Sequence, residues 1–263
     1  MNAKTITVGA YAWLWLCLSL APAQAALEPI HHRIDVRLDP AEQSLQVSDY
    51  IQLRQSGSFE FSLHAGLQPG STTPGVKLQL IDRDSGEVPI ETYRVRLPPG
   101  QTGFQLEYTG RIAHQMQTLR ESRGRQRQLL SGTISAEGVF LSASTAWYPR
   151  FDDRLQTYSL QAQLPQDWYA VSQGQGPEVK SSGSNRLVSW TAATPQDDIY
   201  LIAGPFHFYA RPGEHAEAQV FLREDDASLA ESYLQGPSYT LQGGSVEVLK
   251  NIVAQRGLRL PRR

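Results

Sequence analysis

Histidines and paired aspartates are the side chains of this sequence whose types could support metal or hydrolytic chemistry. The six histidines stand at positions 31, 32, 64, 114, 207 and 215. None is followed by glutamate, so the H-E-x-x-H helix that binds zinc in many peptidases is absent. His31 and His32 are consecutive in a strand-like stretch, which points them to opposite faces. His207 and His215 flank a predicted turn and could share a metal, but we favour unligated surface or strand-edge histidines.

Three pairs of adjacent aspartates raise the question of a two-carboxylate hydrolase. They are Asp152-Asp153, Asp197-Asp198 and Asp225-Asp226. Neighbouring carboxylates diverge in an extended chain, and each pair lies beside a predicted strand or helix start, where aspartate caps or turns the backbone. No G-x-S-x-G elbow, P-loop or dinucleotide glycine motif occurs. The sequence therefore predicts no catalytic, cofactor-binding or metal-binding residue in this chain.

Aromatic residues could instead form a binding platform. The segment FLSASTAWYPRFDD, residues 140–153, brings Trp147 and Tyr148 next to Pro149, and Trp168 follows closely. Exposed, these rings would suit a peptide or a glycan. Because Trp147 precedes a corner and Trp168 begins a predicted strand, we favour the alternative in which all three belong to the core.

The elements that must position these residues are strands. From Ile30 to about Leu222 apolar and polar residues alternate with a period of two, which indicates antiparallel strands with one buried face. The clearest series are Ile30-Ile34-Val36-Leu38 with His32 in an inward position, Leu45-Val47-Ile51-Leu53, Tyr93-Val95-Leu97, Phe104-Leu106-Tyr108 and Tyr158-Leu160-Ala162-Leu164. Turn sequences separate the strands at 39–40, 68–70, 84–86, 98–100 and 182–185. The prediction is a mainly β fold, an antiparallel sandwich or saddle-like pair of sheets, followed by a short helical C-terminal segment.

Two stretches break the period of two. Residues 112–130 are polar and rich in arginine; they form either an anion-binding loop or, as we favour, a solvated insertion or short helix. Residues 225–234 and 245–254 show helical spacing. We accordingly predict a β domain over 26–223 and a helical segment over 224–263, which would be a linker or the start of a truncated catalytic domain.

The N-terminus has the features of a secretory signal peptide over 1–25. Lys4 precedes an apolar run from Ala10 to Leu20, and Ala23-Gln24-Ala25 is a cleavage signal. The run is shorter than the roughly 20 residues that span a bilayer, so we favour cleavage over a retained anchor helix. The single cysteine, Cys17, lies inside this segment without the small residue that precedes a lipid-modified cysteine. We expect an exported protein, periplasmic or extracellular and preferably in a bacterial periplasm, that has no disulfide and no membrane partner after cleavage.

The composition argues against nucleic acid as a partner. Of the 263 residues 40% are hydrophobic, and the formal net charge is -2. A nucleic-acid-binding domain usually presents a clustered basic face, which this balance does not indicate.

A series of aromatic and proline motifs occupies residues 139–208. It comprises Trp147-Tyr148-Pro149, Leu164-Pro165, Trp168 with Ala170-Val171-Ser172 and Gly174, Trp190, and Ala203-Gly204-Pro205-Phe206. This order resembles the N-terminal β domain of the aminopeptidase N family of zinc metallopeptidases, and the opening stretch from His31 resembles that family's first hairpin. The resemblance covers about 30–222.

The resemblance implies a domain that precedes a thermolysin-like catalytic domain, where the zinc and a G-x-M-E-N strand are found. This chain has neither: the zinc helix is absent, and its only methionines are Met1 and Met116, the latter between two glutamines. Members of the family also hold the substrate amine near the strand before the aromatic corner. Here that segment is 142–146 (SASTA), which offers no such contact.

Three hypotheses follow. The favoured one is an isolated or truncated N-terminal domain of an exported aminopeptidase-like protein that is inactive alone. Its partner would be the catalytic domain, against which it packs and whose cleft it lines on one side. We expect H-E-x-x-H to be encoded downstream. The second is a stand-alone exported module that binds peptide or glycan through Trp147, Tyr148 and Trp168. The third is a complete enzyme, which zinc analysis would reveal.

Overall fold

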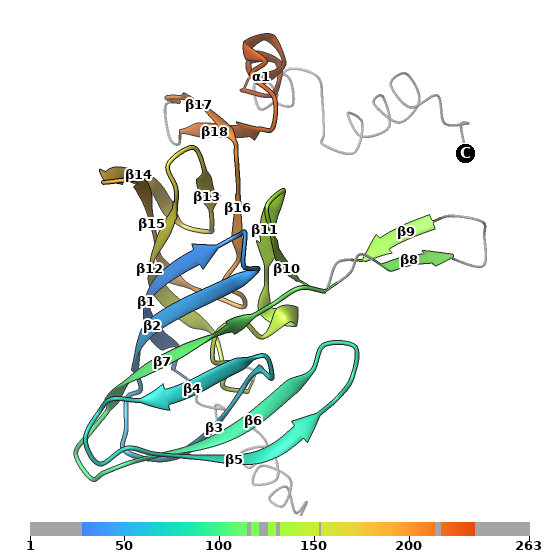
Figure 1. Cartoon of the computed structure of the whole chain (residues 1–263). Coiled ribbons are helices and arrows are strands. Elements are labelled where there is room, and N and C mark those ends of the chain that lie inside the picture. The colour runs from blue at the N-terminus through green and yellow to red at the C-terminus, as the bar shows by residue number, and fades with distance from the viewer. Residues whose placement is uncertain are drawn as a thin grey trace, which may run out of the picture.

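A seven-stranded sheet forms the centre of the computed structural model, which describes residues 28–114, 117–120, 126–129, 132–152, 154–213 and 217–234. Its strands lie in the order β14 (Gln175–Ser182), β15 (Asn185–Gln196), β12 (Gln156–Pro165), β1 (Ile30–Asp39), β2 (Ser44–Gln52), β7 (Gly103–Arg111) and β4 (Leu67–Ser71). Figure 1 shows this sheet curving from β14 and β15 down to β4.

Two smaller sheets lie beside the seven-stranded sheet (Figure 1). The four-stranded sheet has the order β10 (Thr133–Ser135), β11 (Gly138–Leu141), β16 (Leu201–Gly204), β13 (Tyr169–Val171). The three-stranded sheet has the order β3 (Gly57–His64), β6 (Ile90–Leu97), β5 (Lys77–Asp84). Two hairpins complete the described strands, β8 (Gln117–Arg120) with β9 (Gln126–Leu129) and β17 (His207–Arg211) with β18 (Ala218–Leu222).

The period of two seen in the sequence is confirmed as the burial pattern of the strands. In β1 every second residue from Ile30 to Leu38 is buried, and β12 repeats this pattern from Gln156 to Leu164. The apolar residues of all three sheets join in one hydrophobic cluster. A mainly β fold with several antiparallel sheets is therefore confirmed.

One strand pair runs in the other sense. β1 pairs with β2 antiparallel but with β12 parallel, with Ile34 opposite Leu160. Parallel neighbours need a long crossover connection. Here the chain between β1 and β12 supplies it by building the three-stranded sheet and the first two strands, β10 and β11, of the four-stranded sheet, which no local sequence pattern reveals.

One predicted turn, and the helix considered for the 112–130 insertion, differ from the structure. The predicted turn at 68–70 lies inside β4, where Pro69 faces Tyr108 of β7. β4 is an edge strand, and an edge tolerates a proline because one side of its backbone is unpaired. The described parts of the 112–130 insertion are not helical, since Gln117–Arg120 and Gln126–Leu129 form the β8–β9 hairpin and Ala113 bridges to Thr133.

The helix predicted near 225–234 is confirmed as α1 (Ala227–Leu234), which contacts β17 and β18. Asp226 accepts a hydrogen bond from the N–H of Leu229 at 2.8 Å and so caps the first turn. The second predicted helix, 245–254, and the signal segment 1–25 lie outside the described residues. Within the described part of the chain, no helix is long and apolar enough to cross a membrane.

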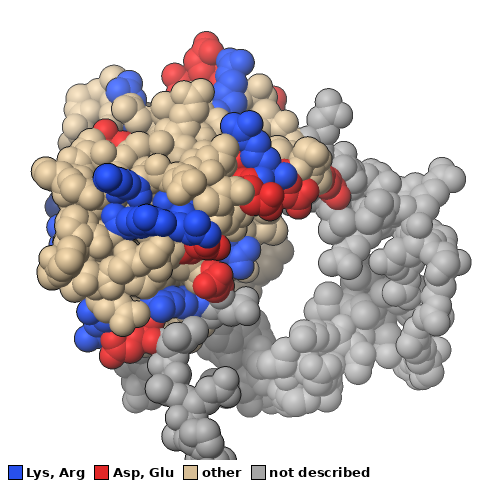
Figure 2. Space-filling view, turned by 90° about the horizontal axis from the view of Figure 1, so that it is seen from below, with Lys and Arg blue, Asp and Glu red and all other residues tan. Residues whose placement is uncertain are grey.

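Charges of both signs are interspersed on the face below the three-stranded sheet (Figure 2). On that sheet Arg94 pairs with Glu60 at 2.6 Å and Arg83 with Glu91 at 2.8 Å. This face therefore carries no large patch of one sign.

Candidate functional site

The corner that carries the aromatic motif connects the two smaller sheets. After β11 the chain forms the short 3-10 helix η1 (Ala143–Thr145), and Ala146 turns it with a left-handed φ of 51°. The next residues run along β3: Arg150 exchanges two backbone hydrogen bonds with Ser62, at 2.8 and 3.0 Å, and the N–H of His64 donates to the carbonyl of Ala146 at 2.8 Å. The corner thus passes from the four-stranded to the three-stranded sheet before entering β12.

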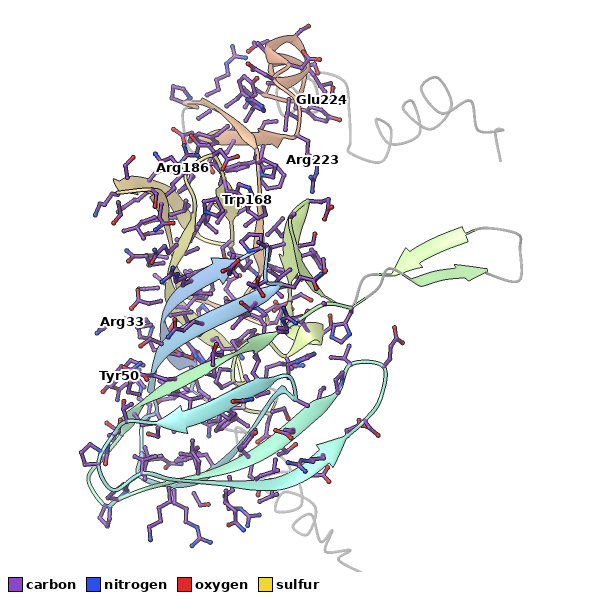
Figure 3. All side chains as sticks on the ribbon, in the orientation of Figure 1. Arg33, Tyr50, Trp168, Arg186, Arg223 and Glu224 are labelled. Atoms are coloured by element: carbon purple, nitrogen blue, oxygen red, sulfur yellow. The ribbon has the colours of Figure 1, made fainter. Side chains whose placement is uncertain are left out.

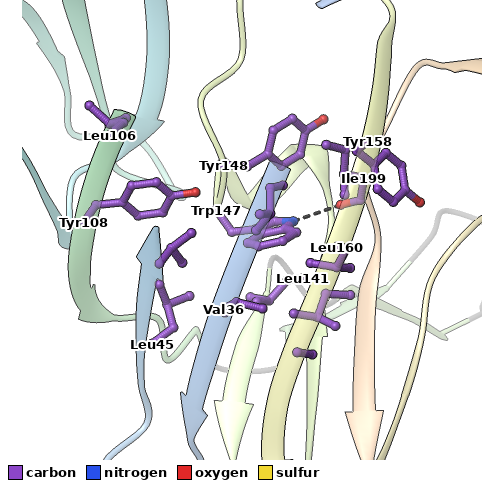
Figure 4. Packing of buried hydrophobic residues seen from close by; sticks show 14 of the residues in the cluster. Val36, Leu45, Leu106, Tyr108, Leu141, Trp147, Tyr148, Tyr158, Leu160 and Ile199 are labelled. Atoms are coloured by element: carbon purple, nitrogen blue, oxygen red, sulfur yellow. Dashed lines mark hydrogen bonds between the residues drawn. The ribbon is translucent and has the colours of Figure 1, made fainter. Parts of the chain in front are cut away.

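The aromatic residues of the corner point into the core (Figure 4). Trp147 and Tyr148 are 0% exposed and Trp168 is 5% exposed. The indole N–H of Trp147 donates to the carbonyl of Ile199 at 2.9 Å, which satisfies the one polar atom of that ring. These three rings pack between the sheets and do not themselves form a platform open to solvent.

A carboxyl group lies behind the corner. The Tyr148 hydroxyl donates to Oδ1 of Asp198 at 3.5 Å, and Asp198 itself is buried. Burial raises the pKa of Asp198, against the lowering effect of the backbone N–H groups of Ala143 and Ile199. Burial, and next the charge of Asp198, raise the pKa of the Tyr148 hydroxyl. These groups hold the small-residue segment 142–146 in place, and Ser144 is its exposed side chain.

The aspartate pairs do not bring two carboxylates together. Asp198 is buried while Asp197 is exposed, so the two side chains diverge. Asp226 caps α1, and Asp225 accepts a hydrogen bond from the hydroxyl of Tyr209. Asp152 is exposed, and Asp153 lies outside the described residues.

The histidines are likewise separated. His31 and His32 lie on opposite faces of β1, where His31 contacts the hydroxyl of Thr157 at 3.0 Å. His207 lies 3.9 Å from Asp225 at the surface, and its expected neighbour His215 lies outside the described residues. Among the described residues, no group of three or more His, Cys, Asp or Glu side chains could hold a metal ion.

A buried polar pair in the seven-stranded sheet escaped the sequence analysis. Nδ1 of His32 lies 2.8 Å from Oδ2 of Asp49, and both side chains are fully buried. Nε2 of His32, Oδ1 of Asp49 and the hydroxyl of the neighbouring buried Tyr108 have no hydrogen-bond partner within the described chain. Asp49 occupies an inward position between Val47 and Ile51. A charged residue at a position where the alternation predicts an apolar one was the feature of the sequence that could have revealed the pair. Because no atom of the pair reaches solvent, it cannot act on a substrate.

A second unpredicted pair joins His64 and His114, whose Nε2 atoms are 2.9 Å apart. The N–H of Gly66 donates to Nδ1 of His64 at 2.9 Å. The proton of the neutral His64 ring must therefore lie on Nε2, which donates to His114. A ring nitrogen that carries a proton is not a metal ligand, so this contact is a structural hydrogen bond.

The fold is similar to that of known metallopeptidase structures, although no family model and no curated protein sequence matches the chain. One such structure is a variant of the M1 zinc metallopeptidase from Deinococcus radiodurans bound to a Tyr-Ser-Ala substrate. The TM-score is 0.52 at 16% identity, over 78% of this chain and 50% of that chain. A further structure of the M1 zinc metallopeptidase from that organism gives 0.49 at 14% identity, over 76% and 49%. The match to the substrate-bound variant establishes a shared fold, and this chain spans about half the length of both structures.

Proposed function

We propose that this chain is the β module of an M1-type zinc metallopeptidase, which packs against the catalytic domain and forms one wall of its cleft. The observation that supports this role is the fold match to half of the Deinococcus enzyme. The sequence lacks the H-E-x-x-H helix, so the zinc and the reacting groups belong to the partner domain. The module itself contributes shape and position.

A half-buried aromatic cluster marks the docking face. Tyr169 of β13, Phe208 of β17 and Phe221 of β18 pack with ring centroids 4.9 to 6.4 Å apart, and Phe206 adjoins Phe221. None of the four rings is fully buried. Aromatic rings with arginine around them are typical of the cores of protein interfaces.

Two arginines contact this aromatic cluster, and Figure 3 labels both, Arg186 and Arg223. The guanidinium of Arg186 lies 4.2 Å from the ring centre of Tyr169, and that of Arg223 lies 5.7 Å from the ring centre of Phe206. Arg223 also donates to the carbonyl of Glu137 next to β11. The cluster is therefore a rigid surface, held on both sides, against which a second domain can pack.

The corner limits what the module can add to substrate binding. In segment 142–146 Ser142 and Thr145 are buried, which leaves the hydroxyl of Ser144 as the exposed polar side-chain group. A hydroxyl is a weak ligand for a charged amine, since a carboxylate would supply a charge-assisted bond. We therefore propose that the module forms one wall of the cleft and does not bind the substrate amine. The alternative of an aromatic platform loses its support, because Trp147, Tyr148 and Trp168 are buried.

Purification from the native source tests the proposal. We expect the chain made alone to bind no stoichiometric zinc and to leave alanine p-nitroanilide intact. The native form should be continuous with, or bound to, a polypeptide that carries H-E-x-x-H and one zinc. Intact-mass spectrometry, zinc analysis and peptidase assays measure these outcomes.

A pair of variants tests the docking face in the native form. Phe208→Glu should dissociate the module or lower peptidase activity, while Val179→Glu, an exposed position on β14, should do neither. The melting temperature of each variant shows that it folds. Zinc and activity in the chain alone, or a native form without any metallopeptidase polypeptide, would contradict the proposal.

A further inference from the structure

The outer face of the seven-stranded sheet carries a groove of about 710 Å³ that the proposed function does not use. It runs across β15, β12, β1, β2, β7 and β4 on the side turned away from the core. Figure 3 shows Arg33 and Tyr50, which belong to the same outer face, pointing away from the smaller sheets. The groove is thus distinct from the aromatic docking face.

The strand register arranges the groove residues in two rows. One row runs from Gln161 through Asp35 and Ser48 to Glu107. The other row consists of Gln163, Arg37, Gln46, Thr109 and Gln68. Each of these named positions is an amide, a hydroxyl or a charged group, while Leu187 of β15 and Gly70 of β4 end the rows. The face can therefore offer several hydrogen bonds to one ligand that lies across the strands.

Most of these side chains are not used inside the protein. Within the described chain no residue forms a hydrogen bond or ion pair with the side chains of Arg37, Gln46, Gln163 or Glu107. Gln46 is exposed and Gln163 half-buried, on either side of Arg37. A planar amide can donate and accept at once, which suits paired hydroxyl groups on a ligand.

The charge and composition of the groove exclude several ligand classes. Asp35 and Glu107 face one arginine in the lining, Arg37, so neither an anion nor nucleic acid is favoured. No exposed aromatic ring lines the rows, whereas peptide-binding grooves gain specificity from apolar pockets and protein interfaces from aromatic anchors. The complementary ligand is neutral, extended and rich in hydroxyl groups.

We propose that this groove binds a linear neutral oligosaccharide across the strands. Neighbouring strands are about 4.8 Å apart, close to the length of one pyranose unit in a linear chain. Successive sugars would therefore meet successive strands, with the amides of Gln163 and Gln46 holding hydroxyl groups on either side of Arg37. This inference does not rest on the proposed peptidase role.

Calorimetric titration with cellohexaose and chitohexaose tests the groove. We expect saturable binding of at least one hexasaccharide that does not weaken when sodium chloride is added, because the ligand is neutral. The double variant Gln46→Ala/Gln163→Ala should bind at least tenfold more weakly. Gln79→Ala, a matched change on β5 of the three-stranded sheet, should bind as the parent chain does.

Each result decides the question. Unchanged melting temperatures show that the variants fold, and Arg37→Gln serves as a second, single change in the groove that should also weaken binding. Absence of heat up to millimolar sugar, or equal loss in Gln79→Ala, would overturn the proposal. So would binding of a neutral Gly-Ser hexapeptide in place of both sugars.

Discussion

His64 is the residue whose surroundings most constrain its charge. Its side chain is buried at the end of β3, with Gly66 on one ring nitrogen and His114 on the other. Burial, and then the neighbouring His114, lower the pKa of His64 from 6.5 to about 4. A proton added to His64 would bind to Nδ1. Nδ1 would then be a donor facing the N–H donor of Gly66, and their hydrogen bond would be lost.

This lowered pKa predicts a loss of stability in mild acid. Between the ordinary histidine pKa of 6.5 and about 4, His64 is protonated in the unfolded chain but stays neutral in the folded chain. The free energy of unfolding therefore falls as pH falls through this window. The contribution is fully present above the unfolded pKa, and its loss reaches about 3 kcal/mol at the lower end of the window. Urea unfolding at a series of pH values measures it.

The variant His64→Asn provides the control. Its short amide keeps an acceptor for the N–H of Gly66 but does not titrate, so its free energy of unfolding should change less between about pH 7 and pH 4. Equal slopes in the two proteins would show that His64 does not sense pH.

At the scale of elements, β4 and β7 are held together by a close backbone approach. A Cβ on Gly110 of β7 would lie 1.9 Å from the carbonyl oxygen of Gly66 and 3.1 Å from the Cα of Leu67. The atoms in the way belong to the backbone, which cannot rotate aside. The start of β4 therefore fits against β7 only while residue 110 is glycine.

We expect Gly110→Ala to destabilise the protein by about 2–3 kcal/mol, because β4 must move to admit the methyl group. Gly70→Ala is the matched control: it lies in β4, the edge strand that pairs with β7, and a Cβ there would meet nothing within 4 Å. Its free energy of unfolding should stay within about 0.5 kcal/mol of the parent chain. Thermal and urea unfolding compare the two variants, and equal losses would contradict the packing argument.

These elements also show how far the sequence alone could predict the structure. Strands such as β1 and β12 were predictable because their burial alternates locally. The parallel pairing of β1 with β12 was not, since it depends on chain folded between them. The inward position of His32 was predicted, but its pairing with Asp49 was not, because the two residues lie on different strands and Asp49 breaks the alternation of its own strand only once. The groove could not be predicted, because it depends on the register of six strands, and no single segment of the sequence determines that register.

At the scale of the whole molecule, the described part of the chain has one hydrophobic core in place of one core for each sheet. The cluster of buried residues runs from Val95 of the three-stranded sheet, through Leu106 of the central sheet, to Leu201 of the four-stranded sheet. Chains of this size often unfold in steps. A shared central sheet favours a single step, because neither smaller sheet can leave without exposing the central one.

The tryptophans allow this expectation to be tested, because they report on one side of the molecule. Trp147, Trp168 and Trp190 are all buried in or beside the four-stranded and central sheets, and the three-stranded sheet has none. Their emission should be blue-shifted and resistant to quenching in the folded state. Far-ultraviolet circular dichroism, in contrast, reports on every strand. The measurement needs the Trp13→Phe/Trp15→Phe chain, so that only these three rings emit.

We expect both signals to give the same unfolding midpoint. The variant Val95→Ala removes buried methyl groups from the three-stranded sheet and should cost about 2 kcal/mol. If the core is continuous, this loss lowers the tryptophan midpoint as much as the dichroism midpoint, although no tryptophan lies in that sheet. If the dichroism midpoint falls while the tryptophan midpoint stays unchanged, the three-stranded sheet unfolds by itself. The corner at Trp147 would then not couple the unfolding of the three-stranded and four-stranded sheets.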